Sequence, residues 1–281
     1  MQFVIGGKNG VPYAKGSKLL GLDLTEYPYF LVSHGFNYIN SSYKPGFSAT
    51  IDYADGTSLT TTLSRNTSYT YNDLLFNNGT RITRIGEIEL QDANTGAGKT
   101  HDPSYIQIKS KHPILTSVHH MFHFTSGQGQ YPTGHNPIDL SQFNTANVTD
   151  FSEMFYKYPA STWWTFGKLD LSHLNTSNGV NFNAMIPTGY DINIIPPDGV
   201  DNFIIDLSGF DMSKAVTQDS YNIFSNNFRS YSHFAIIVDR CDEDTVGKIK
   251  WACQTRAISP HHTVTETTID GKRAILIEWQ E

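Results

Sequence analysis

The amino-acid sequence predicts a mixed, β-rich fold with three parts. These are an N-terminal β-sandwich-like domain over residues 1–100, a short solenoid of repeated units over 101–233 and a β-rich C-terminal cap ending in a hairpin over 234–281. Three observations predict this order. The first part has short strand-like runs, the second an internal repeat, and the third a strand, a turn and a strand. Hydrophobic residues make up 38% of the chain and charged residues 17%, so the chain can bury a core and is not of the disordered class.

Short alternating runs separated by turns fill the first hundred residues. Asp55 and Gly56 lie between the runs 46–53 and 58–63, and a further run covers 81–90. An Asp-Gly pair between two alternating runs is a strong hairpin signal. We therefore expect a sandwich-like unit, and its hairpin resembles those of polycystic-kidney-disease-type immunoglobulin-like domains.

A motif of about 18 residues recurs along the middle of the chain. Residues 138–155 are repeated at 169–186, a looser copy covers 205–224, and a degenerate copy precedes them near 106–122. A single unit of this size cannot bury its own apolar face, so stacked copies share one core. The repeat therefore predicts a row of similar units.

We call 138–155, 169–186 and 205–224 the first, second and third copies. All three open on Asp-Leu-Ser, and the first two continue with Asn-Thr-x-Asn, as in Ile-Asp-Leu-Ser-Gln-Phe-Asn-Thr-Ala-Asn. This motif resembles the repeat of the BspA-type leucine-rich-repeat family of surface proteins, over about residues 105–225. The resemblance implies that each copy lays a short strand beside its neighbours and follows it with a turn and a brief helix. It also implies display on a bacterial, protist or phage surface, with adhesion or host-surface recognition as the function.

Residue spacing within the copies predicts local structure. Val148, Phe151 and Phe155 stand at i, i+3 and i+7, which predicts a short helix with Thr149 or Asp150 as its N-cap. Four asparagines suit turn positions at which a side-chain amide binds backbone groups. These are Asn144, Asn147, Asn175 and Asn178.

An insertion follows the degenerate copy and each of the next two copies, at 124–137, 156–168 and 187–200. Equivalent insertions in stacked repeats lie along one edge, which is often the binding edge. Aromatic rings in such segments suit a sugar ring or a protein hot spot, although packing beneath their own loops is the alternative. The candidate binding residues are Tyr131, Tyr156, Tyr158, Trp163, Trp164 and Tyr190.

Residues 93–100 fit a relaxed phosphate-loop pattern, Ala-Asn-Thr-Gly-Ala-Gly-Lys-Thr. A phosphate loop requires a helix that begins at its Lys-Thr end. Here Pro103 and the alternating Ile106 and Ile108 follow instead. We therefore expect a Gly-rich linker and no nucleotide hydrolysis.

Three histidines, His119, His120 and His123, have a spacing seen in metal sites. Alignment of the copies places the first two at the positions of Ser152 and Glu153, on the polar side of the unit. We expect a polar turn without a neighbouring carboxylate, and no metal site. The two cysteines, Cys241 and Cys253, lack the paired spacing of a zinc site and are expected to be free, buried thiols.

Asp139, Asp170 and Asp206 recur at equivalent places and predict a ladder of carboxylates about 5 Å apart. Retaining glycosidases use two carboxylates at about this separation, one of them with a raised pKa. Because these aspartates belong to the repeat motif, a structural role is favoured and no catalytic residue is assigned. A carbohydrate-active enzyme is the remote alternative.

The net charge of −7 and the lack of a basic cluster exclude nucleic acid as an expected partner. The sequence shows neither a long apolar run nor a secretory leader, so membrane insertion is not expected. We therefore expect a non-enzymatic structural and recognition protein without a cofactor, on a bacteriophage virion as a tail, fibre or capsid-decoration component. Its expected partners are a host-surface glycan or protein, other virion structural proteins and further copies of itself. The alternative is a bacterial cell-surface or secreted adhesin module that binds glycan or protein.

Overall fold

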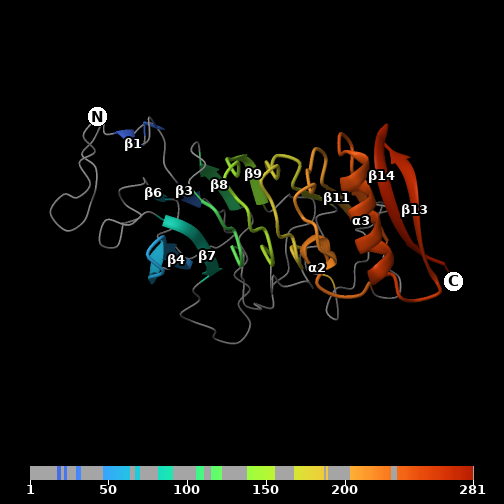
Figure 1. Ribbon diagram of the computed structural model, residues 1–281, viewed down its shortest axis with the longest axis horizontal. Coiled ribbons are helices and arrows are strands. Elements are labelled where there is room, and N and C mark those ends of the chain that lie inside the picture. The colour runs from blue at the N-terminus through green and yellow to red at the C-terminus, as the bar shows by residue number, and fades with distance from the viewer. Residues whose placement is uncertain are drawn as a thin grey trace, which may run out of the picture.

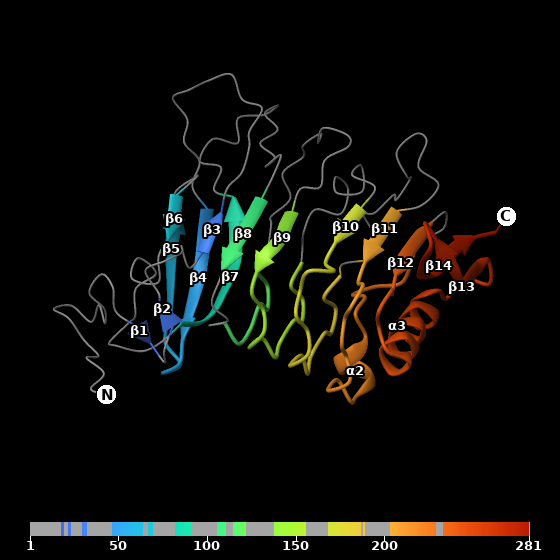
Figure 2. The same ribbon diagram turned by 90° about the horizontal axis from the view of Figure 1, so that it is seen from above.

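The computed structural model is β-rich, with few helices, and its strands stand side by side along the long axis of the molecule (Figures 1 and 2). The residues that it describes are 18–19, 22–23, 30–32, 47–63, 67–69, 82–90, 106–110, 115–121, 138–155, 168–186, 188, 203–228 and 233–280. The N-terminal strands lie at one end of the row and the C-terminal hairpin at the other (Figure 2).

The N-terminal strands pair antiparallel. They are β1 (Lys18–Leu19), β2 (Leu22–Asp23), β3 (Phe30–Val32), β4 (Phe47–Tyr53), β5 (Ser58–Leu63), β6 (Thr67–Tyr69) and β7 (Ile82–Leu90). Strands β5, β4 and β7 form one sheet in that order, whereas β1 pairs with β2 and β3 with β6. The predicted Asp55-Gly56 turn between β4 and β5 is confirmed. Gly56 has a φ of 83°, and the Asp55 carboxylate accepts from the backbone N–H of Thr57 at 2.9 Å.

Each copy of the repeat contributes one short strand, and paired strands from neighbouring copies run parallel. These strands are β8 (Ile106–Ser110), β9 (Ile138–Phe143), β10 (Lys168–Asp170) and β11 (Phe203–Asp206). Strand β8 pairs with β9, and β10 pairs with β11. Among the described residues, β9 and β10 do not pair, so the row of copies divides between two sheets.

The strand pairs form one row of contacts at the start of the copies, and isolated bridges form a second row near their ends. Parallel bridges run from Arg84 to Ser117, from Ser117 to Asp150 and from Asp150 to Asn181. The first of these bridges ties β7 directly to the degenerate copy near 106–122, and the Arg84 guanidinium also donates to the carbonyl of His119 at 2.8 Å. The N-terminal sheet and the repeats are therefore hydrogen-bonded to each other.

The helix predicted from Val148, Phe151 and Phe155 is wrong, because Asp150 lies in a parallel bridge and residues 152–155 form a turn. The backbone N–H of Phe151 donates at 2.8 Å to the carbonyl of Asn181 in the next copy, rather than to a carbonyl four residues back. Glu153 has a φ of 49°, in the left-handed region that interrupts a helix. All three apolar side chains are nevertheless fully buried, so the spacing identified the correct face.

The same left-handed position recurs in neighbouring copies, where it is occupied by His120 and Ala184 with φ of 53° and 51°. The third copy differs, because it contains the short helix α2 (Gln218–Tyr221). Thr217 and Ser220 form a capping box at its N-terminus. The brief helix that the resemblance implies thus occurs in the third copy and not in the first two.

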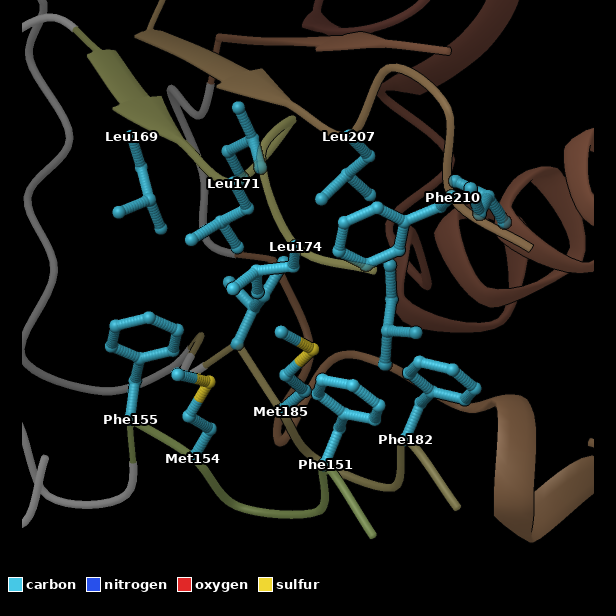
Figure 3. Packing of buried hydrophobic residues seen from close by; sticks show 14 of the residues in the cluster. Phe151, Met154, Phe155, Leu169, Leu171, Leu174, Phe182, Met185, Leu207 and Phe210 are labelled. Carbon is cyan, nitrogen blue, oxygen red and sulfur yellow. The ribbon is translucent and has the colours of Figure 1, made fainter. Parts of the chain in front are cut away.

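Apolar side chains from both rows of contacts meet in one continuous core (Figure 3). The Phe151 and Phe182 rings, at equivalent positions in successive copies, stack with centroids 5.1 Å apart and planes 4° apart. Leu171 and Leu207 approach from the strand side (Figure 3). This cluster continues from Ile51 on β4 through the repeats into the C-terminal strands.

The C-terminal elements are β12 (Phe234–Ile237), α3 (Glu243–Arg256), β13 (His262–Ile269) and β14 (Lys272–Trp279). The predicted C-terminal hairpin is confirmed, since β13 and β14 pair antiparallel. Asp270 and Gly271 form the two-residue turn with φ of 53° and 76°, and both positive angles are typical of a type I′ hairpin. The five-stranded sheet has the order β10-β11-β12-β14-β13.

Helix α3 takes the place of a further copy. In the second copy, the Thr176 hydroxyl accepts from the N–H of Asp211 in the third, at 2.8 Å. Methionine replaces this threonine in the third copy, and the N–H of Met212 donates instead to the Thr245 hydroxyl of α3 at 3.0 Å. Lys248 of α3 donates to the Met212 carbonyl at 2.8 Å. The helix thus completes the hydrogen bonds of the last copy.

The helices within the described ranges are too short or too polar to span a membrane.

Candidate functional site

The principal charged cluster of the repeats lies on the face of the five-stranded sheet that points away from the core. Alternation along β10 and β11 directs Leu169 and Ile205 into the core and the neighbouring side chains to this outer face. We call Lys168, Asp170, Asp206 and Lys272 the outer-face cluster. It is the candidate site, because it gathers ionised groups from the second copy, the third copy and the cap.

Two ammonium groups meet one buried carboxylate in this cluster. Lys168 Nζ lies 3.0 Å from Asp170 Oδ2 and 3.3 Å from Asp206 Oδ2. Lys272 Nζ reaches the same Asp206 oxygen from the cap, at 3.5 Å. The side chain of Asp206 is only 3% exposed, and its charge is balanced by two lysines whose own side chains remain partly exposed.

The second oxygen of each carboxylate, Oδ1, accepts hydrogen bonds that close a turn. Asp206 Oδ1 accepts from the backbone N–H of Ser208 at 3.1 Å and from its hydroxyl at 2.6 Å. Asp170 Oδ1 accepts in the same way from Ser172, at 3.1 and 2.7 Å. The Asp-Leu-Ser motif therefore closes a turn at the end of β10 and of β11. The predicted ladder is confirmed for this pair, since Asp170 and Asp206 are register partners.

The electrostatics keep both carboxyl groups ionised. Burial alone raises the pKa of Asp206, but the Ser208 hydrogen bonds and Lys168 outweigh it and lower that pKa below its ordinary value. The pKa of Asp170 is lowered in the same manner, against its own burial, by Ser172 and Lys168. General acid catalysis by a glycosidase requires one carboxyl group with a raised pKa. This pair lacks that property and is arranged as a structural clamp.

Acidification is expected to weaken this clamp. Because both folded-state pKa values lie below the unfolded value of about 4, the unfolded chain binds protons first, and stability falls as the pH drops below that value. Asp206→Asn keeps a turn acceptor but does not titrate. Its urea midpoint should therefore decrease less than that of the wild type between about pH 6 and about pH 3. An equal decrease in both proteins would contradict this role for Asp206.

The same turn chemistry recurs in the second row of contacts. The predicted turn roles are confirmed for Asn144, whose side chain accepts from the N–H of Ala146 at 3.1 Å, and for Asn175, which accepts from Ser177 at the same distance. The Asn178 amide donates at 2.7 Å to the carbonyl of Ala146 in the preceding copy. These asparagines therefore form both local turns and contacts between copies.

Two of the three predicted histidines lie where alignment of the copies placed them. His119 Nδ1 is 3.0 Å from Ser152 Oγ, and His120 Nε2 is 2.9 Å from Glu153 Oε2. The expectation that no carboxylate lies beside them is therefore wrong, because the next copy supplies Glu153. No group of three side chains suited to a metal ion lies together in the described part of the chain. His123 lies outside the described residues.

The six candidate aromatic residues also lie outside the described residues, as do the Gly-rich segment 93–100 and the side chain of Asp139. The aromatic residues are Tyr131, Tyr156, Tyr158, Trp163, Trp164 and Tyr190. Both cysteines are free, with Cys253 buried and Cys241 partly buried. Burial raises the pKa of each thiol, which opposes formation of the reactive thiolate.

Buried threonines were not singled out by the sequence reasoning. Thr145, Thr176 and Thr245 are almost fully buried, and each hydroxyl bonds to the backbone of a neighbouring unit. The recurrence of Asn-Thr-x-Asn was a usable signal for the first two. Nothing in the repeat marks Thr245, because it belongs to α3.

No family model, curated protein or solved structure matches the chain. The likeness to BspA-type repeats therefore rests on the sequence motif.

Proposed function

We propose that this protein is a non-enzymatic structural and recognition protein, displayed on a bacteriophage virion, that attaches to a host surface through the insertions between its copies. The observation that carries the proposal is the way the copies are joined. Their recurrent polar residues close turns or bond to the next copy, and their apolar residues form one core. The repeat positions thus build a scaffold and leave recognition to the segments that differ between copies.

We also propose that the chain is built as a β-sandwich-like domain, a solenoid and a C-terminal cap. We interpret the parallel strands and bridges as a short solenoid of BspA-type leucine-rich repeats, because equivalent residues of successive copies stand beside each other. The sheet β5-β4-β7 belongs to the β-sandwich-like N-terminal domain, and the strand β12, helix α3 and the hairpin β13–β14 form the C-terminal cap.

Solenoid scaffolds support recognition because they place equivalent insertions side by side. The three insertions carry the six candidate aromatic residues, and aromatic faces in segments of low charge suit sugar rings or a protein hot spot. The charged groups of the outer-face cluster are not the proposed recognition site. The outer-face carboxylates are already bound by serine and lysine groups.

A glycan array tests the recognition step. The full chain is expected to bind a defined set of glycans, and the double variant Trp163→Ala, Trp164→Ala should bind them at least about tenfold more weakly, since each stacked ring contributes of the order of 1 kcal/mol. Trp279→Ala is the matched control, because it removes the same ring from the C-terminal strand β14. Its binding should equal that of the wild type.

Three outcomes would redirect the proposal. Unchanged binding by the double variant would show that these two tryptophans do not bind the glycan. Release of reducing sugar by the wild type, lost in Asp170→Asn, would replace recognition with catalysis. Detection of the chain in a longer cell-wall protein, rather than in purified virions, would favour the adhesin.

A further inference from the structure

Strand β13 forms the outer edge of the five-stranded sheet. It pairs with β14 along its whole length, from His262 opposite Trp279 to Ile269 opposite Lys272. Within the described part of the chain, no other strand pairs with it. Its residues from Thr265 to Thr268 are exposed.

Hairpin geometry determines which backbone groups face this edge. In a two-residue hairpin, the pair that flanks the turn is hydrogen-bonded, and bonded pairs then alternate along the ladder. Thr265 and Thr267 therefore bond to β14. The N–H and C=O groups of Val264, Glu266 and Thr268 consequently point outward, toward the position that a further strand would occupy.

The edge lacks the devices that usually prevent strand pairing. Sheet edges are commonly protected by proline, lysine, a bulge or a very short strand. β13 has eight residues, contains no proline or lysine and has a continuous register with β14. The charge of Glu266 is balanced by Lys250 at 2.7 Å and by Arg273 at 3.0 Å, both within its own chain.

We propose that β13 is a dimerisation strand, which pairs antiparallel with β13 of a second copy about a two-fold axis at Thr265. This register pairs the residues from His262 to Thr268 and places Thr265 opposite its symmetry mate. It places Glu266 opposite Val264 of the partner, whereas a two-fold axis at Glu266 would bring two like charges together. Thr263, which is partly buried, then meets the exposed Thr267 of the partner, so threonine pairs lie on both sides of the axis.

A second copy fits this edge because the sequence of β13 is complementary to itself in that register and carries no uncompensated charge toward the axis. The inference rests on the homo-oligomer expected for the proposed function and identifies its surface. Its test measures mass alone, so a monomer would overturn the inference without bearing on glycan binding.

Charge reversal at the two-fold axis gives a specific experiment. Sedimentation velocity of the full chain should show a species of twice the 31.5 kDa chain mass. Thr265→Lys and Thr265→Glu each place like charges about 5 Å apart across the axis, and each should weaken dimerisation by about tenfold. An equimolar mixture of the two variants should recover the wild-type affinity, because lysine then faces glutamate.

Circular dichroism and the thermal midpoint of each variant are the controls, and both should match the wild type because Thr265 is exposed. A monomeric wild type, an assembly larger than a dimer, or a mixture that stays as weak as its components would each overturn the proposal. A larger assembly counts against it because two-fold edge pairing is closed after two copies.

Discussion

Replacing Phe182 with alanine is expected to lower the free energy of unfolding by about 3–5 kcal/mol, the range for removing a buried phenylalanine ring. Phe182 is fully buried, stacks on Phe151 and lies 6.3 Å from the ring of Phe210. Removing the ring should open a cavity between three successive copies. Hydrogen bonds between the copies should keep the surrounding residues from moving in to fill this cavity. Urea unfolding followed by circular dichroism measures the change.

Val180→Ala is the matched control on the same turn. Its side chain is 45% exposed, so truncation should change stability by less than about 0.5 kcal/mol. Equal urea midpoints for Phe182→Ala and Val180→Ala would show that packing among the rings of Phe151, Phe182 and Phe210 does not stabilise the stacked copies.

Thr245→Val is expected to cost about 1–3 kcal/mol, although it preserves the shape of the side chain. The Thr245 hydroxyl is buried and accepts a hydrogen bond from the N–H of Met212. Through this bond α3 contacts the third copy at the place where a further copy would lie. Valine leaves that buried donor without an acceptor. Urea unfolding measures the loss of stability, and hydrogen exchange at Met212 should become faster, because the contact between the last copy and α3 opens more often.

Thr245→Ser distinguishes the lost hydrogen bond from lost packing. Serine keeps the oxygen that accepts from Met212 and removes only a methyl group. It should therefore retain the slow hydrogen exchange of the Met212 amide. If the serine and valine variants exchanged equally fast at that amide, the hydroxyl would not be the group that anchors α3.

The sequence predicted the elements whose hydrogen bonds are local. The Asp55-Gly56 and Asp270-Gly271 turns require only neighbouring residues and positive φ angles, and the turn of Asn175 closes onto a residue two positions later. The buried faces of the copies also followed from periodicity. Such features depend on a few adjacent residues, so a single sequence reveals them.

Contacts between copies decided the features that the sequence did not predict. Phe151 donates to Asn181, thirty residues further along, and this bond replaces the predicted helical turn. Glu153 reaches His120 across 33 residues. Lys272 joins Asp206 from a hairpin that carries no trace of the repeat. These pairings depend on how copies of unequal spacing are stacked, which no local pattern records.

The hydrogen bonds that join each copy to the next also make the molecule extensible. The Thr176 hydroxyl of the second copy accepts from Asp211, and the Thr245 hydroxyl of α3 accepts from Met212, so threonine hydroxyls bind the third copy from both sides. Duplicating a segment of the length between Leu171 and Leu207 would move the cap outward by about 4.8 Å, the spacing of paired strands. If the copies form the proposed solenoid, we expect gene duplication to lengthen the protein in steps of this size.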